Sequence, residues 1–158
     1  MPIGELFINK VDAFTTEPAS QGQAYGWGMS MEETALSALM TPAPMKALVE
    51  NKYRSLHGKE VINNVPRYDE RELTLAVHIN AKTREQFLSR YQRFCDEVLA
   101  TGSVVIRTKY QPNVYYKCNY ISCTQFSEFN TTYAAFSLKL NEPNPNDRTK
   151  PSDWPNNV

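Results

Sequence analysis

The sequence predicts an α+β fold that is rich in β-strands and has one main α-helix at about residues 83–101. Two observations carry this prediction. Residues 71–79 alternate apolar and polar side chains without a break, which is the period of a half-buried antiparallel strand. Residues 83–101 place apolar side chains at helical spacing and end before Gly102. Three further strands follow the helix as a meander, at residues 103–110, 115–126 and 131–140.

The first thirty residues predict two less regular strands. Residues 6–14 (LFINKVDAF) alternate too loosely to show which face is buried. Residues 24–31 (AYGWGMSM) hold aromatic and apolar side chains at period two, separated by Gly26 and Gly28. Because glycine is unfavourable inside a strand, this pattern indicates a bulge or the close approach of another backbone.

Two helix starts are predicted from capping boxes, in which Ser or Thr is followed three residues later by Glu or Gln. Ser30 and Glu33 precede a short helical pattern at 33–40, which stops before Pro42. Thr83 and Gln86 precede the main helix. The apolar stripe of that helix comprises Phe87, Tyr91, Phe94 and Val98, with Leu88, Cys95 and Leu99 beside it.

The central strand at 71–79 presents two different faces. One face carries Leu73, Leu75, Val77 and Ile79, and the other carries Glu72, Thr74, Ala76 and His78. Turns are expected at Gln111-Pro112-Asn113 and at residues 128–130. The segment before the strand fits two readings: a helix from Pro44 to Leu56 that ends at Gly58, or a long excursion that crosses a subunit surface.

The chain of 158 residues is long enough for one well-buried core, and we expect a single domain at 1–140. Residues 141–158 form a Pro- and Asn-rich C-terminal arm, in which Trp154 is the only large apolar side chain. Such a segment buries too little apolar area to offset its ordering entropy, so on its own we expect it to be disordered. The alternative is an extended arm that docks on a neighbouring subunit through Trp154.

Charge and cysteine usage exclude several classes of protein. Lys and Arg number 17 and Asp and Glu number 17, without a basic run, so nucleic-acid binding is not expected. A secretory signal and a membrane span are not expected either, because no long apolar stretch is present. Cys95, Cys118 and Cys123 lack CxxC spacing, which argues against a disulfide framework and a zinc site.

No catalytic, cofactor-binding or metal-binding residue is predicted, and we expect the protein not to be an enzyme. The phosphate-loop, nucleophile-elbow and metalloprotease motifs are absent from the sequence. His57 and His78 have no carboxylate or cysteine at ligand spacing. A small ligand-binding or enzymatic domain is the alternative, and it would gather Asp69, Glu70 and His78 in one pocket.

A tyrosine-rich segment also fits poorly with single-strand nucleic-acid binding. Two lysines are too few for a stacking platform, and tyrosines in strands more often form cross-strand pairs. The residues concerned are Tyr110, Tyr115, Tyr116 and Tyr120, with Lys109 and Lys117 between them. The remaining profile, a strand-rich domain with several sheet edges and polar arms, is typical of a subunit of an assembly.

The stretch from Pro66 to Pro145 resembles bacteriophage and prophage tail proteins of the distal-tail or tail-tube type. The likeness is a cadence over about half of the chain. It begins with an R-x-x-x-R-x-L-x-L strand at 67–75, continues through the helix and the strand that Gly102 leads, and ends in two strands with a Pro-rich exit. It is a structural pattern and contains no catalytic signature.

The resemblance implies a split antiparallel β-sandwich or rolled barrel flanked by one helix. It implies a structural component of the virion tail, assembled in the host cytoplasm as a hexameric ring with other tail proteins. DNA would pass through the lumen without specific binding. By this analogy, the segments that contact neighbours are 24–31, 41–60 and the C-terminal arm. A ring needs a heterologous interface, which exposed strand edges supply.

Two alternatives within the assembly class remain open. A tail terminator or head-tail joining protein would form a single closed layer, whereas tube rings stack on one another. Many distal-tail proteins carry a second, carbohydrate-binding-like domain after this core, and the 158 residues contain no such segment. Recognition of the host surface is therefore not expected.

Overall fold

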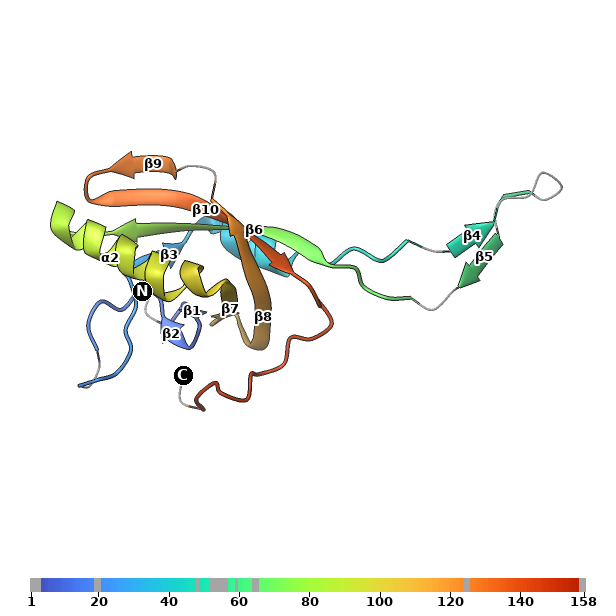
Figure 1. Ribbon diagram of the computed structural model, residues 1–158, viewed down its shortest axis with the longest axis horizontal. Coiled ribbons are helices and arrows are strands. Elements are labelled where there is room, and N and C mark those ends of the chain that lie inside the picture. Colours follow the sequence, from blue (N-terminus) through green and yellow to red (C-terminus); the bar gives the residue numbers. More distant parts are fainter. Residues whose placement is uncertain are drawn as a thin grey trace.

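The structure is a computed structural model, and it describes residues 4–18, 21–47, 49–51, 57–58, 60–63, 66–123 and 126–156. A curled antiparallel sheet forms the body, and a two-stranded ribbon projects from one end (Figure 1). The strands of the sheet lie in the order β2-β1-β7-β8-β10-β6-β3, and β9 also pairs with β10. The bounds are β1 Leu6–Ile8, β2 Val11–Asp12, β3 Met29–Met31, β6 Arg71–Asn80, β7 Ser103–Thr108, β8 Gln111–Ser122, β9 Phe126–Asn130 and β10 Tyr133–Glu142.

The central ladder joins β6 and β10 over their full length, from the pair Tyr133 and Asn80 to the pair Glu142 and Arg71. The alternation predicted for residues 71–79 is confirmed, because every second residue of β6 is buried. The apolar residues of β10 lie opposite them and face the same core. These core pairs are Ile79 with Ala134, Val77 with Phe136, Leu75 with Leu138, and Leu73 with Leu140.

β8 connects the two halves of the curled sheet. Its first part pairs with β7, and its last residues pair with β10, with Asn119 opposite both Ser103 and Asn141. Bulges interrupt each of these ladders, and bulges increase strand twist. The strand-rich α+β class with one long helix is confirmed, and the sheet takes the form of a half-barrel.

The long helix α2 (Arg84–Glu97) covers the core face of the sheet. Its buried Phe94 contacts Trp27 edge-on, with ring centroids 5.3 Å apart, and lies 6.3 Å from Phe136 of β10. The predicted N-cap is confirmed, because the Thr83 hydroxyl accepts a hydrogen bond from the Gln86 N–H. A 3-10 turn at Leu99–Thr101 follows, and Gly102 ends it in the left-handed region at φ 76°.

The short helix α1 (Glu33–Met40) lies where it was predicted, but its capping box is wrong. Ser30 lies inside β3, opposite His78 of β6, so it does not cap the helix. The N-cap residue is Glu32, which makes no side-chain capping bond. Its N–H donates to the Ala76 carbonyl instead, which means that sheet pairing continues to the helix start.

The N-terminal segment is a hairpin rather than the single strand expected at 6–14. Asn9 and Lys10 form a two-residue turn between β1 and β2 with positive φ at both positions, as in a type I′ turn. Of residues 24–31, only β3 is a strand. The close approach expected near the glycines is confirmed at Gly26, where a Cβ atom would lie 2.1 Å from the Asp12 carbonyl oxygen.

Two expected turns are also wrong by a few residues. β8 begins at Gln111, and the turn before it is formed by Lys109 and Tyr110. Residues 128–130 lie inside β9, and the turn to β10 is formed by Thr131 and Thr132. In both places the chain turns at residues without Gly or Pro, so the polar residues nearby were a misleading signal.

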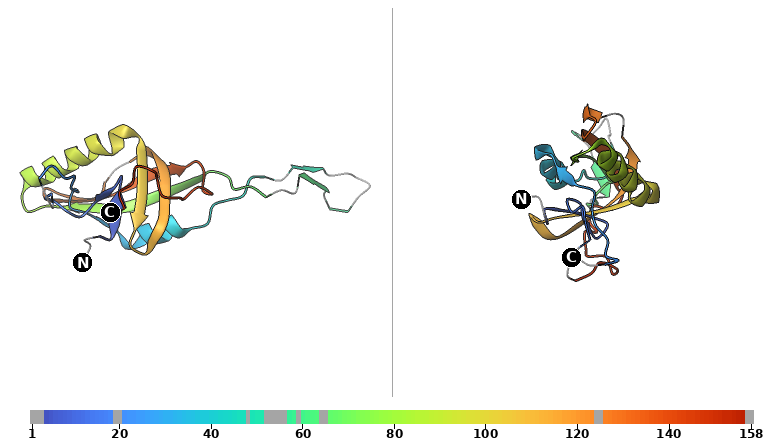
Figure 2. Two further views of the ribbon diagram at one scale, coloured as in Figure 1. Left: turned by 90° about the horizontal axis from the view of Figure 1, so that it is seen from below. Right: turned by 90° about the vertical axis from the view of Figure 1, so that its left-hand side faces the viewer.

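The C-terminal segment, residues 143–156, runs back along the body of its own chain (Figure 2). Trp154 is buried at 4% exposure and contacts the ring of Tyr115 on β8, with centroids 5.1 Å apart. Ion pairs add to this anchor, Lys117 with Asp147 at 3.1 Å and Lys10 with Asp153 at 2.7 Å. In this structure Trp154 therefore docks within its own subunit. The division into a domain at 1–140 and an arm at 141–158 stays a prediction.

Candidate functional site

A long antiparallel ribbon leaves the body after α1 and returns at β6 (Figures 1 and 2). Its far part is β4 (Val49–Asn51) paired with β5 (Glu60–Asn63). Its near part is held by the Asp69 N–H donating to the Pro44 carbonyl and the Lys46 N–H donating to the Arg67 carbonyl. Of the two readings of residues 44–57, the helix is wrong and the chain makes a long excursion, whereas its crossing of a subunit surface stays a prediction. Residues 48 and 52–56 of that range lie outside the described residues.

The root of the ribbon carries exposed apolar side chains. Met45 and Tyr68 face each other across an isolated bridge and are 56% and 47% exposed. Met40, at the end of α1, is 53% exposed. A single large apolar side chain at a surface is ordinary, but three beside one projecting element indicate a contact surface.

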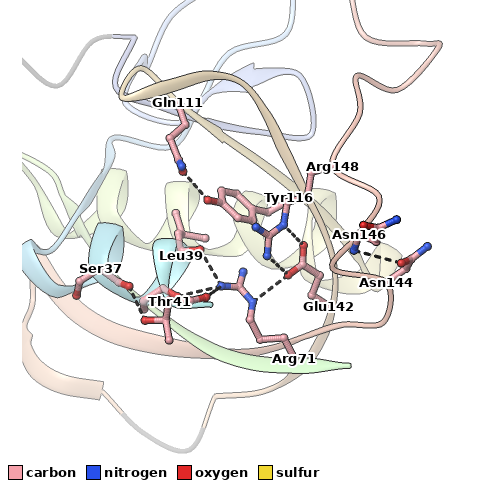
Figure 3. A network of polar contacts seen from close by, with 11 residues as sticks. Ser37, Leu39, Thr41, Arg71, Gln111, Tyr116, Glu142, Asn144, Asn146 and Arg148 are labelled. Atoms are coloured by element: carbon pink, nitrogen blue, oxygen red, sulfur yellow. Dashed lines mark hydrogen bonds and ion pairs between the residues drawn. The ribbon is translucent and has the colours of Figure 1, made fainter. Parts of the chain in front are cut away.

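A buried arginine clamps both strands of the ribbon at this root (Figure 3). Arg71, the first residue of β6, is 3% exposed. Its Nη1 donates to the carbonyls of Leu39 at 2.7 Å and Thr41 at 2.6 Å. These carbonyls end α1, where unpaired carbonyl groups and the helix dipole favour a cation. One side chain on the returning strand thus fixes the point at which the outgoing strand leaves.

Glu142, the last residue of β10, compensates the charge of Arg71. It is fully buried, and its Oε1 lies 2.9 Å from the Arg71 Nε. Arg148 of the C-terminal segment reaches the same carboxylate with two bonds of 3.0 Å each, from its Nε and its Nη2. The carboxylate therefore joins the ribbon root to the C-terminal segment. We call Arg71, Glu142 and Arg148 the root clamp.

Tyr116 completes the surroundings of the root clamp. Both guanidinium groups lie over its ring, Arg148 at 4.8 Å and Arg71 at 5.4 Å from the centroid. Burial raises the pKa of Tyr116, and its hydroxyl donates to the Gln111 side chain. Burial by itself would lower the pKa of Arg148, but the bonds to Glu142 outweigh it and raise that pKa. The cluster has one carboxylate for two guanidinium groups, and the aromatic ring offers its negative face to both.

The residues that an enzymatic reading would need are not brought together. His78 lies near the opposite end of β6 from Asp69 and Glu70, and its Nδ1 lies 3.0 Å from the Glu32 Oε1. Glu70 accepts a hydrogen bond from Asn141. The structure does not describe enough of the His57 surroundings to place it in a site. No group of three His, Cys, Asp or Glu side chains in the described part of the chain could hold a metal ion.

The tyrosine-rich segment does not form a stacking platform in the described residues. Tyr116 lies in the core beside the root clamp, whereas Tyr115 lies under Trp154. Tyr110 is exposed in the turn before β8.

Cys118 is buried, which raises its pKa to about 12, so its thiol stays protonated at neutral pH.

A groove of about 920 Å³ lies between the N-terminal hairpin and the end of the C-terminal segment. Three of the charged side chains that line it have polar partners. The Asp12 carboxylate accepts from the N–H groups of Gly4 and Phe14, Lys10 pairs with Asp153, and Arg107 donates to the Pro112 carbonyl. Among the described helices, none is long and apolar enough to cross a membrane.

No family model matches the chain, and no curated protein matches it significantly in sequence. Among solved structures, the chain is similar to the Dit protein of phage SPP1, described as a paradigm of the hub adsorption apparatus in phages that infect Gram-positive bacteria. The TM-score is 0.49 and the sequence identity is 15%, over 67% of this chain and 42% of that one. The chain therefore spans less than half the length of Dit. Dit belongs to the class that the sequence resembles, the distal-tail proteins.

Sequence reasoning missed the root clamp, although one signal for it was present. Arg71 has the same parity as Leu73 and Leu75, so the pattern of β6 already placed it on the buried face. A charge there requires a buried partner. Glu142 likewise continues the parity of Leu138 and Leu140, but it lies two residues beyond the end predicted for that strand.

Proposed function

We propose that the protein is a structural, non-catalytic subunit of a bacteriophage tail, of the distal-tail or tail-tube type, which self-associates into a ring. The sequence resemblance over residues 66–145 supports the class of protein. The observation that carries the self-association is the projecting ribbon, which the root clamp holds away from the body. By the same resemblance the ring is hexameric and contacts other tail proteins.

The physical argument rests on the isolation of the ribbon. A single two-stranded ribbon is at best marginally stable in water, because it buries little and leaves both of its edges unpaired. The described residues of β4 and β5 pair with each other and with no other strand. A buried ion-pair cluster holds this ribbon in a fixed direction, so the ribbon needs a further surface on which to pack. On this proposal a neighbouring subunit supplies that surface.

The charge of the chain suits a ring through which DNA passes. The net charge is zero, and the sequence contains no basic run that would neutralise phosphates. A lumen that held DNA tightly would impede its passage. On this proposal the protein is part of the virion tail and assembles in the host cytoplasm.

The test compares the full chain with a variant without the ribbon. Pro44 and Asp69 are hydrogen-bonded at 2.8 Å, so a short Gly-Ser turn can replace residues 45–68 without moving the body. Native mass spectrometry over a range of concentrations should show the full chain approaching a hexamer and the ribbon-less variant remaining a monomer. Circular dichroism confirms that the variant is folded.

A full chain that stays monomeric at its highest soluble concentration would contradict the proposal. Electron microscopy of the assembled sample then separates the subclasses. Rings that stack indicate a tube subunit, and a single closed layer indicates a distal-tail or terminator protein.

A further inference from the structure

The outer edge of β9 is an unprotected strand edge. β9 pairs with β10, from Phe126 opposite Phe136 to Asn130 opposite Tyr133, and with no other described strand. Four of its five residues are exposed. Natural edge strands are usually blocked by Lys, Pro or a covering loop. The β9 sequence FSEFN contains neither Lys nor Pro, and Glu128 is its only charged residue.

An exposed aromatic side chain marks the same edge. Phe129 is 62% exposed, although its ring stacks on Phe126 at 5.7 Å and meets Phe87 of α2 edge-on at 6.0 Å. Leu88 of α2 is 50% exposed. The edge therefore combines free backbone groups with an apolar rim, which are the two features of a surface that accepts an added strand.

The ribbon and β9 lie at opposite ends of the molecule (Figure 1). The ribbon of one chain cannot reach its own β9, because the ribbon leaves at the Arg71 end of β6 whereas β9 pairs with the other end of the ladder, at residues 133–136 of β10. Between two copies the contact is heterologous, since the donated element and the receiving edge are different surfaces. Contacts of this type leave one of each surface free at the ends and continue until a ring closes.

Charge also favours this pairing. Residues 44–69 contain five basic residues, Lys46, Lys52, Arg54, Lys59 and Arg67, and three acidic ones, Glu50, Glu60 and Asp69. Glu128 is the only charged residue of β9, and beyond the effect of burial its carboxylate and that of Glu32 raise the pKa of the neighbouring Tyr133. A basic ribbon is attracted to such an edge, and a second β9 is repelled from it.

We propose that the free edge of β9 receives an edge strand of the β4–β5 ribbon from a second copy of this chain, which extends the sheet across the subunit boundary. The inference rests on the proposed function, since it names the surface through which the ring closes. β9 has five residues and can pair with the whole of β4 or β5, which have three and four.

The test blocks the edge with lysines. Glu128 and Asn130 are exposed, so the double variant Glu128→Lys, Asn130→Lys changes the edge and its charge while the core stays intact. The matched control is Glu17→Lys, Gln21→Lys, which makes the same change of charge at two exposed positions outside the strands. Association should weaken by roughly tenfold or more in the edge variant, measured by sedimentation equilibrium, and remain unchanged in the control.

A mixing experiment tests the directionality. The ribbon-less variant offers only β9, and the edge variant offers only the ribbon. Each variant alone should be monomeric. Added to the full chain, each variant should bind one end of an assembly and block further growth, so that the assemblies become shorter or fail to close. Hydrogen exchange should show protection of residues 126–130 in the assembled full chain and not in the ribbon-less variant.

The outcomes separate this inference from the proposed function. The edge variant could assemble as strongly as the full chain while the ribbon-less variant stays monomeric. That result overturns the β9 assignment and leaves the proposed ring standing. A full chain that is monomeric overturns both. Strong association of the edge variant with itself in an isologous dimer would also contradict the inference.

Discussion

At the scale of single residues, Glu142 is the side chain on which the root clamp depends. It is fully buried between Arg71 and Arg148, and Arg71 has no access to water that could replace it. Removing one member of a buried ion pair leaves an uncompensated charge, which typically costs about 3–5 kcal/mol. We therefore expect Glu142→Gln to lower the free energy of unfolding by about 3 kcal/mol, measured by urea denaturation.

The matched control for this substitution is Glu72→Gln on the same pair of strands. Glu72 and Lys139 are both about half exposed, and their charged atoms lie 3.6 Å apart. Exposed pairs of this kind contribute at most about 1 kcal/mol. If the two variants lost equal stability, the clamp would be no more than a surface ion pair.

At the scale of elements, the two helix starts give a direct comparison between sequence and structure. The Thr83 hydroxyl caps α2, so Thr83→Ala should cost about 1 kcal/mol of stability. Ser30 lies in β3 and caps nothing, so Ser30→Ala should change stability by less than about 0.5 kcal/mol. Thermal unfolding of both variants measures the difference. Equal losses would mean that Ser30 does cap α1 in solution.

The same comparison shows which parts of the fold can be predicted. β6 and α2 were predictable because each repeats its period over ten or more residues, and the repeat itself carries the information. Short elements lack this redundancy. Ser30 fits a capping box, but pairing of β3 with β6 overrides the local motif. The Asn9-Lys10 turn lacks the glycine that marks most type I′ turns.

Long-range contacts explain what the sequence could not show. The C-terminal segment is too polar to fold alone, yet Tyr115 on the distant strand β8 supplies a partner for Trp154. Glu142, at the end of β10, supplies one for Arg148. The ribbon is similar, since its pairing joins residues that a local pattern reads as either helix or loop. For the candidate site, the parity of Arg71 with Leu73 and of Glu142 with Leu140 was visible in advance, but their pairing with each other was not.

The C-terminal segment should respond to acid through its two exposed ion pairs. Hydrogen bonds from Thr149 and Lys117 lower the pKa of Asp147, and Lys10 lowers the pKa of Asp153. A carboxyl group whose pKa is lower in the attached state stabilises attachment at every pH above its pKa in the detached state. This contribution is lost as the pH falls through the lowered pKa. We expect attachment to be constant from pH 7 to about pH 4 and to weaken below it.

Acrylamide quenching of Trp154 fluorescence measures this attachment when Trp27 is replaced by Phe. Quenching should rise only below about pH 4. The variant Asp147→Asn, Asp153→Asn should show stronger quenching at neutral pH and a flatter acid response. A rise centred near neutral pH would point to a histidine instead and contradict the assignment to these carboxyl groups.

At the scale of the whole molecule, the root clamp connects two segments that lie far apart in sequence. The ribbon leaves the body at Thr41 and returns at Arg71, and Arg148 reaches the clamp from the C-terminal segment. Arg148 is 29% exposed at its side chain, so it can be removed with less damage to the core than Arg71. The position of the ribbon should therefore depend on whether the C-terminal segment is attached.

Substitution of Arg148 tests this dependence. We expect Arg148→Ala to increase hydrogen exchange at the ribbon root, in the amides of Lys46 and Asp69 that pair the two strands. Without Arg148, Arg71 is the only cation beside the Glu142 carboxylate and shifts toward it, away from the carbonyls of α1. The control is Lys117→Ala, which removes another bond to the C-terminal segment without touching Glu142. Exchange at the root should rise in the first variant alone. An equal rise in both variants would mean that attachment of the C-terminal segment stabilises the ribbon root by a route other than the bond to Glu142. No rise in either variant would show that Arg71 and α1 alone hold the ribbon root.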